Sequence, residues 1–148
     1  MFEKIMQFII KAEVGRYWST GGYTNDPVDA GGETKWGISK RANPTVDIKN
    51  LTLPQAMEIY KKKYWNPEWE RLGLPLAACM LDTNINGGDE DKMLKDSGGD
   101  YVQFLQLRLA RYKDIIARKP SQKKYENGWN NRIRDLRRFI DDEKNQQG

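Results

Sequence analysis

Carboxylates are the groups in this sequence best suited to acid–base chemistry. The 148-residue chain contains no His, so the commonest general base and the commonest zinc ligand are both missing. Zinc-hydrolase, Ser-His-Asp and Cys-His mechanisms are therefore excluded. Glycoside hydrolysis is the reaction that most often needs only two carboxyl groups, one to protonate the leaving oxygen and one to act from the opposite face of the sugar.

Two places in the chain combine acidic residues with surroundings that this reaction needs. Glu13 follows an apolar helical stretch and has aromatic residues close to it in sequence. An apolar, water-poor setting raises the pKa of a carboxyl and keeps it protonated near neutral pH. Residues 23–34 supply Asp26, Asp29 and hydroxyl side chains among glycines. By spacing alone, however, acidic residues in such a segment are more often turn formers.

Helical periodicity predicts most of the elements that must position these residues. Helices are expected from residue 2 to about 12 or 13, from 52, from 75 toward 84, over 101–116 with Pro120 as the stop, and from about 125. Thr52 and Gln55 have the spacing of a capping box. Residues 14–38 contain two Gly-Gly pairs and predict turns or a short hairpin, and the polar tail at 141–148 is expected to fray.

The predicted architecture is therefore a mainly α, single domain over residues 1–148, with a small irregular or β-hairpin insert near residues 14–38. The length fits one domain. The lone Cys79 cannot form an intramolecular disulfide.

Charge and hydropathy limit the classes of partner and the cellular compartment that the sequence is compatible with. The net charge of +4 would favour an anionic partner, but no domain-scale basic footprint indicates nucleic acid. Four arginines of the last helix are expected on a solvated face: Arg132, Arg134, Arg137 and Arg138. The first apolar run is shorter than the roughly 7–15 residues of a secretory signal, and nothing approaches the ~20 needed to span a membrane. We therefore expect synthesis in a bacterial cytoplasm, no stable membrane insertion and no cofactor.

Short motifs spread along the chain closely resemble those of glycoside hydrolase family 108. They are GGYTNDP at 21–27, DAGGETKWGIS at 29–39, YKKKYWNP at 60–67, DTNINGG at 82–88 and NGWNNRI at 127–133. The family contains phage endolysins and N-acetylmuramidases. The resemblance implies a lysozyme-like, largely helical fold that cleaves peptidoglycan glycan strands between N-acetylmuramic acid and N-acetylglucosamine. It also implies release by a holin, after which the protein acts on the wall in the periplasm.

One departure from the family pattern concerns the catalytic acid. The family Glu directly precedes Gly-Gly-Tyr, whereas this chain has Thr20 there. An insertion of about seven residues would leave Glu13 in the role of the acid, at a helix end as in the family. An alignment without a gap leaves a lysozyme fold lacking its acid, which would make the chain a wall-binding or phage structural protein. We favour Glu13, because a helix terminus positions a side chain more firmly than a loop does.

The resemblance also implies roles for the other site residues. With Glu13 as the general acid, Asp29 and Thr34 would orient or activate a water that attacks the anomeric carbon from the opposite face, which would invert the anomer. Asp26 competes for the second carboxylate and ranks below Asp29, because the following Pro27 favours a turn role.

Substrate contacts are expected from aromatic and amide side chains. Tyr23 and Trp36 would stack on the apolar faces of sugars, and Asn84 and Asn86 would bond their hydroxyl and acetamido groups. After residue 88 the chain has only a short acidic and basic segment where family members usually carry a small peptidoglycan-binding motif, so that motif is shortened here.

Overall fold

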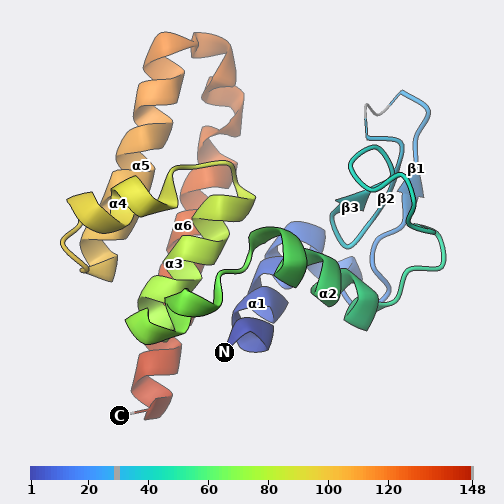
Figure 1. The fold of residues 1–148 in the computed structure, drawn as a ribbon. Helices are drawn as coiled ribbons and strands as arrows, with labels where there is room; N and C mark the ends of the chain where they lie inside the picture. The colour runs from blue at the N-terminus through green and yellow to red at the C-terminus, as the bar shows by residue number, and fades with distance from the viewer. Residues whose placement is uncertain (29–30, 148) are drawn as a thin grey trace. The chain divides into compact units, whose positions relative to one another are not determined.

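The computed structural model describes residues 1–28 and 31–147 and divides the chain into two compact units (Figure 1). The first unit, Met1–Trp65, contains two helices, a 3-10 turn and a small sheet. The second, Asn66–Gly148, is helical throughout its described elements. The described residues therefore confirm the expected fold class, mainly α with a small β insert, while the assignment of residues 1–148 to one domain stays a prediction.

The first unit begins with α1 (Phe2–Val14) and ends with α2 (Leu53–Tyr64). The apolar face of α1 is fully buried and comprises Phe2, Ile5, Met6, Ile9 and Ile10. The predicted capping box of α2 is present: Gln55 N donates to Thr52 Oγ1 at 3.3 Å, and Thr52 N donates to Gln55 Oε1 at 3.0 Å. These reciprocal bonds satisfy backbone donors that the first helical turn leaves unpaired.

Between these helices lie the 3-10 helix η1 (Gly15–Tyr17) and a three-stranded antiparallel sheet. Its strands are β1 (Thr24–Asn25), β2 (Glu33–Lys35) and β3 (Ile38–Ser39), in the order β1-β2-β3. Thr24 pairs with Thr34, and Thr34 pairs in turn with Ser39. The insert predicted near residues 14–38 therefore contains a small sheet.

The turn between β2 and β3 consists of Trp36 and Gly37, both with positive φ, 49° and 75°. Positive φ at both central residues is the signature of a type I′ hairpin turn. The Tyr60 hydroxyl donates to the Trp36 carbonyl at 2.7 Å. A Cβ at position 37 would lie 2.5 Å from that hydroxyl, so only glycine fits there. Tyr60 of α2 thus fastens the hairpin turn.

The second unit runs from η2 (Pro67–Leu72) through α3 (Leu74–Ile85) and α4 (Glu90–Asp96) to α5 (Tyr101–Arg118). The 3-10 helix η3 (Pro120–Tyr125) then leads into α6 (Glu126–Gln147). Helices α5 and α6 form a long antiparallel hairpin, and α3 packs against both (Figure 1). Phe104, Leu105, Leu136 and Ile140 are buried in these helices.

Two features of the second unit differ from expectation. Helix α4 was not predicted: it is capped by Asp89, which accepts a bond from Lys92 N at 3.2 Å, and is anchored by buried Met93. The prediction that residues 141–148 fray is wrong for the described part, because α6 continues to Gln147. The Tyr101 hydroxyl donates to Asp141 Oδ1 at 2.8 Å and fastens this last part of α6 to α5.

Among the described helices, none combines the length and apolar character that crossing a membrane requires.

Candidate active site

The end of α1 carries the carboxylate predicted as the acid. Glu13 is the second-last residue of the helix. Its side chain is exposed, so the apolar, water-poor surroundings expected for it are not found in this conformation. The helix ends at Val14, and the next residue, Gly15, has a φ of 65° and a ψ of −135°, which suit a residue without a Cβ. Tyr17 then reverses the chain, because its carbonyl accepts bonds from Thr20 N at 3.2 Å and Gly21 N at 2.8 Å.

The reversal brings the Gly-Gly-Tyr segment back against the helix end. A Cβ built on Gly22 would lie 3.0 Å from Val14 Cγ1 and 3.5 Å from Tyr17 Cβ, and Gly22 has a φ of 59°. Residues 15–20 therefore form a loop, here called the excursion, whose two ends meet where Gly22 lies against Val14. The family-like segment resumes in contact with Val14, the residue that follows Glu13.

Thr20 is the residue that aligns with the family acid when no gap is allowed. Its side chain stabilises the chain reversal at Tyr17. Its side chain is exposed, and its Oγ1 donates to the Tyr17 carbonyl at 3.3 Å. A hydroxyl engaged in this way stabilises a local reversal of the chain.

The sheet presents one face made of hydroxyl groups. Residues directly opposite one another in a sheet share a face, so Thr34 shares its face with Thr24 on β1 and Ser39 on β3. The hydroxyls of Thr24 and Thr34 lie 2.7 Å apart and form a hydrogen bond. Thr34, predicted to help position a water, thus sits at the centre of a row of hydroxyls.

The opposite face of the sheet carries the carboxylate of Glu33, which no motif in the sequence singled out. Successive strand residues point to opposite faces, so Glu33 faces away from the Thr34 hydroxyl. The Tyr23 hydroxyl donates to Glu33 Oε2 at 2.6 Å. This hydrogen bond, with smaller contributions from burial and from the negative charge of Glu33, raises the pKa of Tyr23 above its ordinary value. Tyr23, predicted to stack on a sugar, is thus half-buried and holds Glu33.

Of the two aspartates predicted as the second carboxylate, the structure describes only Asp26. Asp26 closes a local turn, because Val28 N donates to its Oδ1 at 2.9 Å. Such an Asx turn is a common structural use of aspartate before proline. Asp29 lies outside the described residues.

Trp36, predicted to stack on a sugar, lies in the interior, where only 5% of its surface is exposed. Its indole N–H donates to the Trp18 carbonyl, and the Lys35 ammonium lies 5.1 Å from its ring centroid. Its backbone N donates to the Gly21 carbonyl at 2.8 Å. In this conformation Trp36 is a packing residue that ties the hairpin to the Gly-Gly-Tyr segment, and it leaves no open ring face for a sugar.

Asn84 and Asn86, the predicted amide contacts, belong to the second unit. Asn84 is half-buried on α3. Asn86 caps the C-terminus of α3, where its Nδ2 donates to the Asp82 carbonyl at 2.7 Å and to Asp82 Oδ2 at 3.3 Å. Asn86 is therefore part of a larger polar network around Asp82.

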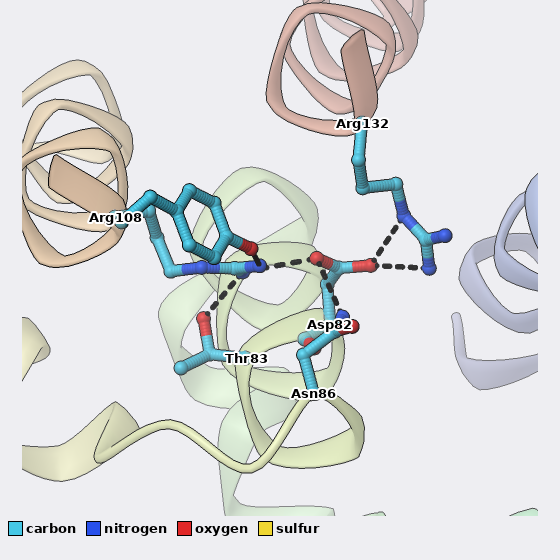
Figure 2. Close-up of polar contacts among 6 residues, drawn as sticks. Asp82, Thr83, Asn86, Arg108 and Arg132 are labelled. Carbon is cyan, nitrogen blue, oxygen red and sulfur yellow. Dashed lines mark hydrogen bonds and ion pairs between the residues drawn. The ribbon is translucent and has the colours of Figure 1, made fainter. Parts of the chain in front are cut away.

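That network joins three helices through one buried carboxylate (Figure 2). Asp82 on α3 is 0% exposed. Its Oδ2 accepts a bond from Arg108 of α5 at 2.9 Å, and its Oδ1 accepts bonds from Nε and Nη2 of Arg132 of α6 at 3.0 and 2.8 Å. Arg108 also donates to Thr83 Oγ1 at 2.9 Å and to the Tyr112 hydroxyl at 2.6 Å.

The buried guanidinium of Arg108 is paired with a carboxylate that also binds Arg132. Burial on its own lowers the pKa of Arg108, but the Asp82 carboxylate and the Tyr112 hydroxyl outweigh it, so the net shift is upward. The guanidinium therefore remains charged in the interior, and a buried charge of this kind is tolerated only when it is paired and hydrogen-bonded.

The expectation that Arg132 lies on a solvated helix face is wrong, since only 14% of its side chain is exposed. The sequence did contain a signal for this. Arg132 follows Trp129 by three residues and precedes Leu136 by four, which places it on the apolar stripe of α6. Arg134 and Arg138 are exposed as expected, and Arg137 is partly covered and pairs with Asp141 at 3.0 Å.

The comparisons with known proteins agree with the sequence motifs. The family model for glycosyl hydrolase 108 matches residues 7–88, which is more than half of the chain and includes Glu13, the sheet and Asp82. The chain belongs to the glycosyl hydrolase 108 family. Neither the curated proteins nor the solved structures contain a significant match. Membership confirms the predicted family and makes the chain, by class, a glycoside hydrolase.

Proposed function

We propose that this glycoside hydrolase is a lysozyme-type N-acetylmuramidase that cleaves the β-1,4 bond between N-acetylmuramic acid and N-acetylglucosamine in peptidoglycan. The observation that carries the proposal is the closed excursion of residues 15–20. Gly22 lies against Val14. Setting aside Val14 together with the excursion, residues 14–20, supports an alignment in which Glu13 takes the position of the family acid before Gly-Gly-Tyr.

In the proposed reaction, the carboxyl of Glu13 acts as the general acid and donates a proton to the glycosidic oxygen as the bond from that oxygen to the anomeric carbon breaks. A water, positioned by Thr34 and deprotonated by Asp29, attacks the anomeric carbon from the opposite face. The anomeric configuration would invert, a mechanism that needs two carboxyls roughly 6.5–9.5 Å apart. Asp26 is the weaker choice for the base, because its Oδ1 already accepts the bond from Val28 N.

The test is clearing of outer-membrane-permeabilised Gram-negative cells, with released sugars analysed for new reducing ends and for their anomeric form. The wild-type protein and Thr20→Ala should clear the cells, and a folded Glu13→Gln should not. Placing a carboxylate at the alternative position, in Glu13→Gln/Thr20→Glu, should not restore clearing, because position 20 belongs to the excursion. Restoration by this double variant would transfer the role of the acid to position 20.

Retained binding of wild-type protein to purified wall without any cleavage would contradict the proposal and favour a wall-binding protein with the fold of a hydrolase.

For such an enzyme we also propose a role in phage lysis, with synthesis in the bacterial cytoplasm and holin-dependent release to the wall. Expression in a Gram-negative host should then lyse cells only when a holin is co-expressed, and lysis by the enzyme alone would contradict this route.

A further inference from the structure

The excursion of residues 15–20 carries an exposed aromatic residue paired with a cation. Tyr17 is 53% exposed, which is high for a large aromatic side chain. The Arg16 guanidinium carbon lies 4.9 Å from the centre of the Tyr17 ring, and Arg16 Nη2 donates to the Tyr17 hydroxyl at 2.8 Å. The cation–π contact and the hydrogen bond together restrain the orientation of the exposed ring.

The backbone beneath this pair is fixed from several sides. The Tyr17 carbonyl accepts bonds from Thr20 and Gly21, and the adjacent Trp18 carbonyl accepts the indole N–H of Trp36. The Lys11 ammonium of α1 lies 4.5 Å from the centre of the Trp18 ring. Tyr17 is therefore presented from a rigid support, which is what a binding group needs in order to contact a ligand precisely.

The position of this aromatic residue links it to the proposed acid. A Cβ on Gly22 would contact both Tyr17 Cβ at 3.5 Å and Val14 Cγ1 at 3.0 Å. Tyr17 thus emerges beside the helix end that carries Glu13. A glycan strand whose scissile bond lies at Glu13 has further sugar rings on either side, within reach of a group placed there.

We propose that Tyr17 is a substrate-binding residue that stacks on a sugar ring of the glycan strand next to the one that Glu13 cleaves, with Arg16 as a positioning residue for the ring. An aromatic ring that is apolar on its face and polar at its tip suits a sugar, which presents C–H groups on one face and hydroxyls at its edge. The inference rests on the proposed function. It adds a contact with the glycan strand that a residue of the excursion makes.

Binding is tested separately from cleavage in the Glu13→Gln background, by co-sedimentation with purified peptidoglycan sacculi. Adding Tyr17→Ala should raise the Kd about tenfold, which corresponds to about 1.4 kcal/mol and is within the range of aromatic contacts. Tyr17→Phe keeps the ring and should bind within about twofold of the parent. Arg16→Ala should have a smaller effect than Tyr17→Ala. The matched control is Tyr125→Ala, which removes a tyrosine of similar exposure, 47%, from the second unit and should leave the Kd unchanged.

Kinetics on soluble glycan fragments give the second readout. With Glu13 intact, Tyr17→Ala should raise KM about tenfold and leave kcat within about twofold, because the contact is made away from the reacting atoms. The proposal is overturned if Tyr17→Ala binds sacculi as tightly as its parent, or if Tyr125→Ala weakens binding equally. Sacculi that are bound but never cut, with binding still lost in Tyr17→Ala, would refute the proposed hydrolysis while supporting the role of Tyr17. Absence of both binding and cleavage would refute both.

Discussion

The hydroxyl of Tyr23 donates to Glu33 Oε2 across 2.6 Å, on the sheet face opposite the hydroxyls of Thr24 and Thr34. A slip of one residue in the pairing of β1 and β2 would exchange the faces of Glu33 and Thr34. The bond between Tyr23 and Glu33 therefore holds the register that keeps the Thr34 hydroxyl on its own face.

The same bond predicts the alkaline behaviour of Tyr23. Because the hydrogen bond to Glu33 raises its pKa above the ordinary 10.0, Tyr23 should ionise later than a tyrosine in the unfolded chain. Its contribution to stability is fully present below about pH 10 and is lost as the pH rises through the higher folded value. The measurement is the tyrosinate absorbance difference between wild type and Tyr23→Phe, followed over pH. In Glu33→Gln the transition should move back toward the ordinary value, and an unchanged transition would contradict the assignment.

Removing the carboxylate at the centre of the second unit should be severely destabilising. Asp82→Asn leaves the buried guanidinium of Arg108 without its counter-charge, and breaking a buried pair in this way costs about 3–5 kcal/mol. The matched variant is Asp135→Asn, which breaks the exposed pair with Arg134 and should cost at most about 1 kcal/mol. Urea unfolding followed by circular dichroism gives both values, and similar losses in the two variants would disprove a central role for Asp82.

Closure of the excursion depends on the missing side chain at Gly22. Gly22→Ala introduces a Cβ at 3.0 Å from Val14 Cγ1, in addition to the cost of a positive φ for alanine, about 1–2 kcal/mol. Gly32 has a similar φ of 69°, and a Cβ built there meets no atom of the described residues within 4 Å, so Gly32→Ala isolates the backbone cost. Gly22→Ala should lower the free energy of unfolding by about 1 kcal/mol more than Gly32→Ala. The double variant Val14→Ala/Gly22→Ala should recover part of that difference, and no recovery would argue against the contact.

Thr34 offers a test of the proposed water-positioning group. Thr34→Val keeps the shape and removes the hydroxyl, and should lower kcat on glycan by about 10²-fold, the scale of a group that helps place or activate the attacking water. Thr34→Ser should retain most of the activity. The control is Thr24→Val, which deletes the bonded neighbour and should cost less than about tenfold. Equal losses at positions 24 and 34 would indicate that the hydroxyl pair supports the sheet and takes no part in catalysis.

The elements that the sequence predicted are those whose signals are local. The capping box at Thr52 and Gln55 predicts the start of the helix at Leu53–Tyr64. The helical spacing of its apolar residues predicts α1. The position of Trp36 depended on a distant residue: a tryptophan at φ 49° is costly in a hairpin turn, and Tyr60, 24 residues later, donates the bond that holds it. Local patterns therefore favoured an exposed, sugar-stacking aromatic residue at a position that the structure buries.

The same contrast holds for the candidate site. The prediction of Glu13 as the acid rests on a helix end and a motif that lie close together in the sequence. The partners of Asp82 could not be predicted, since Arg108 and Arg132 approach it from 26 and 50 residues away. The helical spacing of Arg132 indicates a position on the apolar stripe of α6, but not the carboxylate that it meets there. Charge alone does not distinguish a buried anchor from a solvated side chain.

The sharing of one carboxylate between two arginines determines how the second unit opens. If α5 or α6 separates from α3, a charge pair formed with Asp82 must be broken, and the remaining charges stay in a dry interior. Separation of either helix from α3 therefore adds the cost of breaking an ion pair to the loss of apolar contacts. The slowest amide protons of α3, α5 and α6 should consequently exchange with solvent together, as one cooperative folding unit whose lifetime is set by a single aspartate.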